Sequence, residues 1–282
     1  MELAPSVLNR VVTAALREDL DVAGDVTTDA VTEADRRGVG HIVAREELVL
    51  AGLPVAREVF RKLDQTLRFD PAFSDGRPVA PGTRVAAVRG LTRPILQGER
   101  TALNFLMRMC GIATATRRAV DEIAGTSARI LDTRKTAPGL RRLDKYAVAA
   151  GGGVNHRMGL FDAVMIKDTH LDAGCTIPQA VARALDRGHP ASAITVEVRN
   201  LEQLQQALDS GAGRALLDNL ESRTLREAVQ LASGRIVLEA SGGLRPGRLR
   251  QVAETGVDFL SLGWLTHSAP AADLAMEMEA TS

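Results

Sequence analysis

Charged residues follow a series of apolar segments in the second half of the chain, and their types suit an anionic substrate. Lys135, Lys167, Glu197 and Asp218 each lie at or just beyond the end of a different apolar run. Lysines are compact charges that can neutralise phosphate groups. Two carboxylates can bind a hard divalent cation through oxygen or favour a cationic transition state. The pattern predicts a site for a polyanion and a divalent cation.

The charges near this predicted site are sorted by sign. Residues 129–157 contain seven Lys or Arg and two Asp, a net charge of +5, and they include Arg134, His156 and Arg157. Glu197 and Asp218 come from a later part of the chain. A zinc site is not expected, because the five His and two Cys show no ligand-like spacing.

Small residues follow the last two apolar runs. Ser241, Gly242 and Gly243 come after the first of these runs, and Gly263 after the second. Such loops expose backbone N–H groups that can hold a phosphate, and barrel enzymes often bind phosphate after their last two strands. His267 lies close by in the sequence and joins the candidate site residues, although an isolated histidine is more often structural.

The elements that must position these residues form a repeating pattern. Helical patterns lie between most of the apolar runs, which are nearly continuous rather than alternating, as in strands buried on both faces. We expect parallel strands in a barrel of the (β/α) type, with the site at their carboxyl ends. The predicted strands cover residues 128–132, 163–166, 194–198, 215–217, 236–240 and 259–262.

The first hundred residues have a different organisation. An amphipathic helix is predicted over 7–20, followed by short strands, a second helix over 54–63, and loops rich in Pro and Gly. A long helix over 96–124 connects this part to the repeating part. We expect an N-terminal domain over 1–110 and a barrel domain over 111–269, with the tail 270–282 packing on the N-terminal domain.

The composition is that of a folded protein without an excess of charge. The 282 residues include 35 Lys+Arg and 35 Asp+Glu, and 45% are hydrophobic, which argues against disorder and against a general nucleic-acid binder. The two cysteines are expected to be free thiols in a reducing compartment. With neither a signal peptide nor an apolar run long enough to cross a membrane, we expect a cytoplasmic protein that binds no membrane.

These features occur together in one known family. The chain resembles quinolinate phosphoribosyltransferase (decarboxylating), also called nicotinate-nucleotide pyrophosphorylase, over nearly its whole length. The resemblance lies in 24–28 (GDVTT), 98–104 (GERTALN), 132–141 (DTRKTAPGLR), 151–153 (GGG), 155–160 (NHRMGL), 166–168 (IKD), 196–198 (VEV), 217–219 (LDN), 239–243 (EASGG) and 265–268 (LTHS).

The resemblance implies a reaction, a fold and an assembly. Members transfer the phosphoribosyl group of 5-phosphoribosyl-1-pyrophosphate to quinolinate, release carbon dioxide and pyrophosphate, and form nicotinate mononucleotide for NAD biosynthesis. It further implies an N-terminal α/β sandwich domain joined to an open α/β barrel. A requirement for Mg²⁺ and a homodimer, or a higher homo-oligomer, with shared active sites are also implied.

The resemblance assigns roles to individual residues. Arg134, His156 and Arg157 match binders of the quinolinate carboxylates, and Arg100 matches an arginine supplied by the neighbouring subunit. The remaining matches are Lys135 and Lys167 between quinolinate and pyrophosphate, Glu197 and Asp218 at the ribose hydroxyls and magnesium, and Ser241, Gly242, Gly243 and Gly263 at the 5-phosphate.

Three positions depart from the family pattern, and two other functions stay open. Thr169, Arg199 and Trp264 stand where Asn, an acid and a small residue are usual; Trp264 could reshape the phosphate loop. One alternative is a paralogous enzyme that ribosylates another aromatic acid, as in molybdate-transport operons. The other is a non-catalytic anion-binding module, which the presence of both lysines and both carboxylates disfavours.

Overall fold

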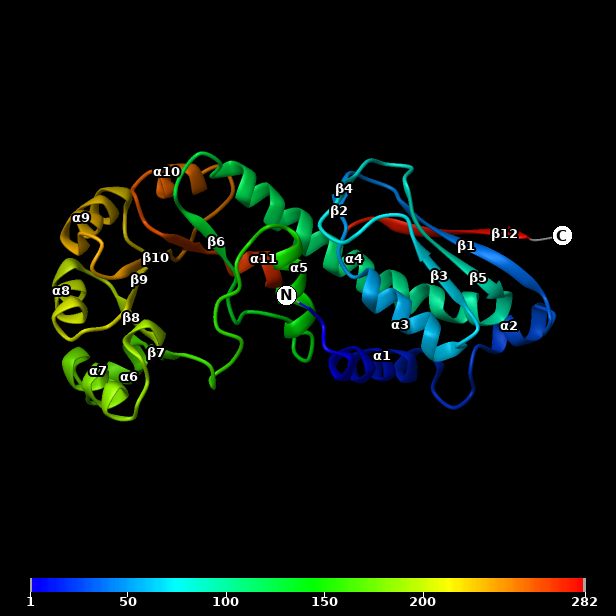
Figure 1. Cartoon of the computed structure of the whole chain (residues 1–282), viewed down its shortest axis with the longest axis horizontal. Helices are drawn as coiled ribbons and strands as arrows, with labels where there is room; N and C mark the ends of the chain where they lie inside the picture. Colours follow the sequence, from blue (N-terminus) through cyan, green and yellow to red (C-terminus); the bar gives the residue numbers. More distant parts are fainter. Residues whose placement is uncertain (1, 281–282) are drawn as a thin grey trace. The chain divides into compact units, whose positions relative to one another are not determined.

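The computed structural model describes residues 2–280 and divides into two compact units (Figure 1). The first unit comprises residues 2–117, 136–152 and 265–280 of the described chain, and the second comprises 118–135 and 153–264. Met1 and residues 281–282, at the ends of the predicted N-terminal domain and tail, lie outside the described residues.

The first unit contains a four-stranded antiparallel sheet in the order β12-β1-β5-β3. Its central strand β1 pairs along its length with the C-terminal strand β12, from Gly38 opposite Ala280 to Ala44 opposite Leu274. The strands of this unit are β1 (Arg37–Ala44), β2 (Leu48–Val49), β3 (Arg68–Pro71), β4 (Pro78–Val79), β5 (Arg84–Leu91) and β12 (Leu274–Ala280).

The helices of the first unit have an apolar face and a defined start. Pro lies at the first or second position of α1 and α3, where its missing N–H costs no hydrogen bond. The Asp75 carboxylate accepts hydrogen bonds from the N–H groups of Gly52 and Leu53 at the start of α3. The helices are α1 (Pro5–Leu20), α2 (Val26–Val31), α3 (Leu53–Leu63), α4 (Thr92–Glu122), whose last residues belong to the second unit, and α5 (Arg141–Ala150).

The second unit is built on a six-stranded parallel sheet in the order β6-β11-β10-β9-β8-β7. Strands β6 and β7 form its two edges, so the barrel is open. The strands are β6 (Arg129–Leu131), β7 (Val164–Ile166), β8 (Ile194–Val198), β9 (Arg214–Asp218), β10 (Val237–Ser241) and β11 (Phe259–Ser261).

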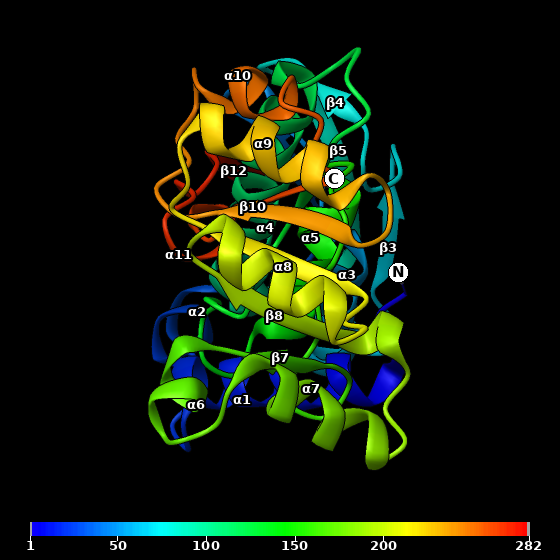
Figure 2. The ribbon, with the colours of Figure 1, turned by 90° about the vertical axis from the view of Figure 1, so that its left-hand side faces the viewer.

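Helices cover the outer face of this parallel sheet, and Figure 2 shows α7, α8 and α9 lying along it. These helices shield the outer face of the strands, which explains why Val196, Leu217 and Leu260, which alternate with pocket-lining residues, are buried. The remaining elements are α6 (Asp168–Asp172), α7 (Ile177–Asp186), η1 (Ala191–Ala193), α8 (Leu201–Asp209), α9 (Ser222–Ala232), α10 (Leu249–Ala253) and α11 (Trp264–His267).

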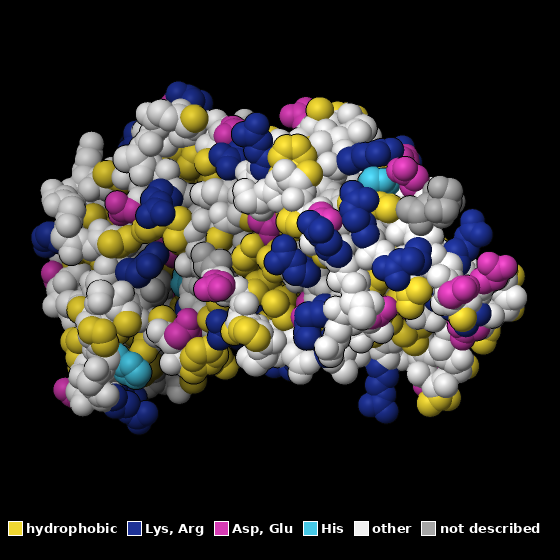
Figure 3. Space-filling model, turned by 45° about the vertical axis from the view of Figure 1, so that its right-hand side comes forward, with side chains coloured by type: hydrophobic (Ala, Val, Ile, Leu, Met, Phe, Trp, Pro, Cys, Tyr) yellow, Lys and Arg dark blue, Asp and Glu magenta, His cyan; other side chains and the backbone are white. Residues whose placement is uncertain are grey.

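The predicted α/β class, with parallel strands in the C-terminal part, is confirmed. Each predicted strand of the second unit overlaps an observed one, and the long helix α4 begins at Thr92, four residues before the predicted start. Both cysteines are free thiols, and burial raises the pKa of Cys110 to about 12. Acidic and basic side chains are interspersed on the face seen in Figure 3, in keeping with the net charge of zero. Among the described helices, none has the length and apolar character needed to cross a membrane.

Candidate active site

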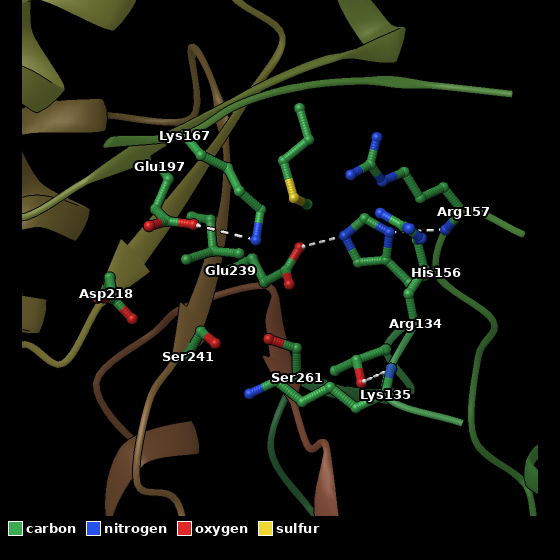
Figure 4. A pocket seen from close by; sticks show the side chains of 13 residues that line it. Arg134, Lys135, His156, Arg157, Lys167, Glu197, Asp218, Glu239, Ser241 and Ser261 are labelled. Atoms are coloured by element: carbon green, nitrogen blue, oxygen red, sulfur yellow. Dashed lines mark hydrogen bonds and ion pairs between the residues drawn. The ribbon is translucent and has the colours of Figure 1, made fainter. Parts of the chain in front are cut away.

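A pocket of about 300 Å³ lies at the carboxyl ends of the parallel strands, within the second unit (Figure 4). Side chains that point inward from every strand of the sheet, or from the segment after it, meet there. The pocket is lined by Thr133, Arg134, Lys135, His156, Arg157, Met165, Lys167, Glu197, Leu216, Asp218, Glu239, Ser241 and Ser261. The structure thus brings together eight of the thirteen site residues predicted from the sequence.

Basic groups line one part of the pocket. Arg134 and Lys135 follow β6, and Arg157 follows the bridge between Leu131 and Val154. Burial lowers the pKa of the Arg157 guanidinium, and the positive charge of Arg134 lowers it further. Two neighbouring guanidinium groups form a place where a carboxylate is stabilised.

Carboxylates line the pocket at the neighbouring strands β8 and β9. Glu197 and Asp218 end in the same cavity, and the Lys167 ammonium lies 3.9 Å from the Glu197 carboxylate. Burial raises the pKa of the Glu197 carboxyl, Lys167 opposes this shift, and Asp218 adds to it. The two carboxylates therefore repel each other across a site that a cation would stabilise.

The floor of the pocket contains a buried carboxylate that the sequence analysis did not select. The Glu239 side chain is 1% exposed and lies 3.2 Å from Nε2 of His156 and 3.7 Å from an Arg214 nitrogen. Burial alone would raise the pKa of the Glu239 carboxyl, but the neighbouring His156 ring and the charge of Arg214 lower it overall. Glu239 is therefore held as a carboxylate below the site.

Strand alternation explains the residues that the sequence analysis missed. Glu239 lies two residues before Ser241, Leu216 two before Asp218, and Met165 two before Lys167, so each points to the same side of its strand as a predicted residue. Ser261 and Thr133 complete this set. Stepping back by two from each predicted strand-end residue would have found the first three.

The loop after β10 has a backbone shape that only glycine adopts readily. Gly242 has a φ of +97°, and a Cβ added to it would lie 2.2 Å from Oδ1 of Asn219. Gly243 has a φ of +60°. The loop is further fixed by Trp264, whose indole N–H donates a 3.0 Å hydrogen bond to the carbonyl of Leu244.

Five predicted site residues lie outside the pocket lining. Gly242 and Gly243 directly follow Ser241, and Gly263 follows β11. Arg100, on α4, and His267, at the end of α11, belong to the first unit. Their roles stay predictions.

Comparisons with known proteins agree with this geometry. A family model described as "Quinolinate phosphoribosyl transferase, N-terminal domain" matches residues 25–110, and one described as "Quinolinate phosphoribosyl transferase, C-terminal domain" matches residues 112–277. This chain belongs to the quinolinate phosphoribosyltransferase family.

Similar family members come from plants and bacteria. Quinolinate phosphoribosyltransferase (decarboxylating) 1b of Nicotiana tabacum is 38% identical, with 96% of this chain and 82% of that protein covered. A probable nicotinate-nucleotide pyrophosphorylase of Synechocystis sp. is 41% identical, with 93% and 90% covered. The structure of the nicotinate-nucleotide pyrophosphorylase from Francisella tularensis has a TM-score of 0.94 and 36% identity, and covers 99% of this chain and 98% of that one.

The three departures from the family pattern have distinct surroundings in this family member. Arg199 forms an ion pair with Asp168, so its charge is directed at the segment after β7. The Thr169 N–H donates a hydrogen bond to the same Asp168 side chain. The Trp264 indole is hydrogen-bonded to the backbone of Leu244, so Trp264 contacts the predicted phosphate loop after β10 directly.

Proposed function

We propose that this family member transfers the phosphoribosyl group of 5-phosphoribosyl-1-pyrophosphate to the ring nitrogen of quinolinate. The products are pyrophosphate, carbon dioxide and nicotinate mononucleotide, a precursor of NAD. The observation that carries this proposal is the separation of charge in one pocket. Arg134, Lys135 and Arg157 come from the β6 side, whereas Glu197 lies near the end of β8 and Asp218 ends β9.

The basic side suits quinolinate, which is a dianion with two adjacent carboxylates. Arg134 and Arg157 offer planar forks of N–H donors that match carboxylate oxygens. Because the pKa of Arg157 is lowered by burial and by Arg134, a bound carboxylate relieves the repulsion between the two guanidiniums. This arrangement orients the ring nitrogen toward the centre of the pocket.

The transfer step uses the two lysines and the two carboxylates of the pocket. The bond between the anomeric carbon and the pyrophosphate oxygen breaks with its electron pair on oxygen, and the ring nitrogen forms the new bond to that carbon. Lys135 and Lys167 neutralise the departing pyrophosphate. Positive charge that develops at the anomeric carbon is stabilised by Glu197 and Asp218, which are fixed on adjacent strands.

Decarboxylation follows from the charge created by the transfer. The ring nitrogen is then cationic, and it accepts the electron pair left when the adjacent carboxylate departs as carbon dioxide. This step needs little beyond a fixed orientation of the ring, which the arginines supply.

Mg²⁺ fits the acidic side of the pocket. Mg²⁺ is typically held by one or two carboxylates together with substrate phosphates and water, so it does not need a larger protein cage. Glu197 and Asp218 supply two such carboxylates, whereas residues 2–280 contain no group of three or more His, Cys, Asp or Glu suited to a metal. Bound there, Mg²⁺ would neutralise pyrophosphate charge.

We further propose that the enzyme works as a homodimer or higher homo-oligomer in which Arg100 of the neighbouring subunit completes the site. Arg100 is exposed on α4. Leu160 and Phe161, which follow Arg157 closely, are 74% and 79% exposed, more than large apolar side chains usually are. An interface over this segment would cover them and bring a second chain close to Arg157.

Substrate choice tests the proposed function. The purified protein is incubated with 5-phosphoribosyl-1-pyrophosphate, Mg²⁺ and either quinolinate or nicotinate, and mononucleotide and carbon dioxide are measured. We expect turnover with quinolinate and release of carbon dioxide. Turnover with nicotinate alone would instead assign a different aromatic acid to the pocket.

A further inference from the structure

Lys167 lies in a segment of the second unit that has little buried apolar surface. The segment follows β7, a three-residue strand at the edge of the parallel sheet that pairs with β8. Helix α6 begins directly after Lys167, and each of its five residues is exposed or half-buried. Segments with little apolar burial open at a low free-energy cost. Polar contacts therefore contribute much of what fixes the position of Lys167.

Local hydrogen bonds order the backbone around Lys167. Its N–H donates a 2.9 Å hydrogen bond to Nδ1 of His170, and the Thr169 N–H donates a 2.6 Å hydrogen bond to Oδ1 of Asp168. Both bonds join residues within 167–170. They shape this turn, but they do not attach it to the neighbouring strand.

The attachment comes from the segment after β8. The Arg199 guanidinium forms an ion pair with Oδ2 of Asp168. The backbone N–H of Arg199 donates a 2.8 Å hydrogen bond to the Gln203 side chain on α8, which fixes the base of the Arg199 side chain. Glu197, two residues earlier, lies 3.9 Å from the Lys167 ammonium (Figure 4). Two ion pairs, Lys167–Glu197 and Asp168–Arg199, therefore join the ends of two neighbouring strands.

The second of these ion pairs depends on a departure from the family pattern. An acid is usual at the position of Arg199, and an acid would repel Asp168 instead of pairing with it. The charges of Arg199 and Asp168 shift the pKa of the Glu197 carboxyl in opposite directions, so both lie near the acidic side of the pocket. Because their charges offset each other there, the contribution left to the pair is to fix the position of the chain.

We propose that Arg199 is a positioning residue that holds Asp168, and through it Lys167, so that the Lys167 ammonium stays at the pyrophosphate end of the pocket. The proposal rests on the proposed function for the identity of the bound group. The Lys167 side chain is 44% exposed, and a long side chain of this kind retains many rotamers. Fixing its backbone narrows the region that the ammonium can reach.

A double-mutant cycle separates positioning from direct contact with pyrophosphate. We expect Arg199→Gln to raise the KM for 5-phosphoribosyl-1-pyrophosphate about three- to fivefold, as much as an exposed ion pair supplies. The KM for quinolinate should change by less than about twofold, because quinolinate is assigned to the basic side of the pocket. In an Asp168→Asn background, Arg199→Gln should add nothing further, since its route through Asp168 is already lost.

Arg223→Gln is the matched control for these kinetics. Arg223 forms an exposed ion pair with Glu227 on α9, and neither residue lines the pocket. Breaking this pair should leave both KM values unchanged. The control therefore measures what the loss of an exposed arginine does away from Lys167.

Three kinetic outcomes would overturn the proposal. An Arg199→Gln effect of the same size with and without Asp168→Asn would show that Arg199 acts on pyrophosphate without Asp168. A wild-type KM for 5-phosphoribosyl-1-pyrophosphate in Arg199→Gln would show that the ion pair positions nothing. An equal rise in the KM for both substrates would show a general disturbance of the pocket.

A measurement on the free protein keeps this test separate from that of the proposed function. Hydrogen–deuterium exchange is followed by mass spectrometry in peptides that cover residues 164–172. We expect faster exchange in Arg199→Gln and in Asp168→Asn, and wild-type exchange in Arg223→Gln. Unchanged exchange in Arg199→Gln would contradict the proposal whatever the substrate. Faster exchange in a protein that does not turn over quinolinate would support the ion pair's role and refute the proposed function alone.

Discussion

Glu197 combines a strained electrostatic environment with a position at the centre of the proposed chemistry. Its side chain is 14% exposed, and it shares the pocket with the like-charged Asp218. Raised pKa values of this kind concentrate at functional sites, because burial and like charges are costly for the fold and useful for the reaction. We therefore expect the charge of Glu197 to favour the reaction and to lower the stability of the fold.

Removing either carboxylate should reduce turnover far more than quinolinate binding. The loss of one fixed electrostatic group at a reacting centre costs about 2.7–4 kcal/mol, or about 100- to 1,000-fold in kcat. We expect this for Glu197→Ala and for Asp218→Ala, measured by steady-state kinetics together with quinolinate titration. A collapse of quinolinate affinity in both variants would instead place the carboxylates at the quinolinate end of the pocket.

Neutralising Glu197 should stabilise the fold at neutral pH. A carboxyl whose pKa is higher in the folded than in the unfolded protein makes the fold less stable as pH rises through that range. Glu197→Gln mimics the protonated form, so its melting temperature should exceed that of wild type at neutral pH, and the gain should disappear under acidic conditions. Glu202→Gln, at an exposed position on α8, serves as the control. No gain in Glu197→Gln would contradict the raised pKa.

The sequence identified charges at strand ends because these residue types stand out there, but it could not identify their supports. Glu239 begins the 239–243 (EASGG) stretch, but nothing in the sequence marks it as a support for the 155–157 segment. Its partners His156 and Arg214 are far from it in the sequence, and only the folded sheet brings the three together. Asp132 begins the 132–141 stretch, yet its hydrogen bonds to Asn155 and His156 depend on the Leu131–Val154 bridge.

At the scale of elements, the loop after β10 should tolerate substitution at one glycine and not at another. An added Cβ at Gly242 would overlap Asn219, whereas Gly247, with a φ of +84°, has no heavy atom within 4 Å of such a Cβ. We expect Gly247→Ala to cost about 1 kcal/mol of stability through backbone strain alone. Gly242→Ala should cost more and also raise the KM for 5-phosphoribosyl-1-pyrophosphate. If Gly242→Ala and Gly247→Ala had equal effects on stability and on this KM, the loop would not belong to the phosphate site.

Elements with a strong local period were predicted, and those that depend on distant pairing were missed. Strands β8 and β10 are apolar runs followed by polar residues, which the sequence shows directly. Strand β12 alternates Leu274, Met276 and Met278 with polar or small residues, but it forms only by pairing with β1 more than 200 positions earlier. Its partner could not be inferred from a local pattern.

At the scale of the whole molecule, mixing two inactive variants tests the shared site. Arg100→Ala lacks the arginine proposed to act on the neighbouring subunit, and Glu197→Ala lacks a carboxylate of the pocket. A mixed dimer has one site in which both residues are intact, so activity should return when the two proteins exchange subunits. Exchange verified by mass spectrometry without recovered activity would place Arg100 in its own chain's site or outside catalysis.

The central claim is that phosphoribosyl transfer and loss of the carboxylate next to the ring nitrogen occur in one pocket. It is tested most directly by supplying quinolinate labelled in that carboxylate and measuring labelled carbon dioxide against pyrophosphate. We predict equal amounts of the two products, and neither product when 5-phosphoribosyl-1-pyrophosphate is omitted. Pyrophosphate without carbon dioxide, or carbon dioxide without 5-phosphoribosyl-1-pyrophosphate, would contradict the account.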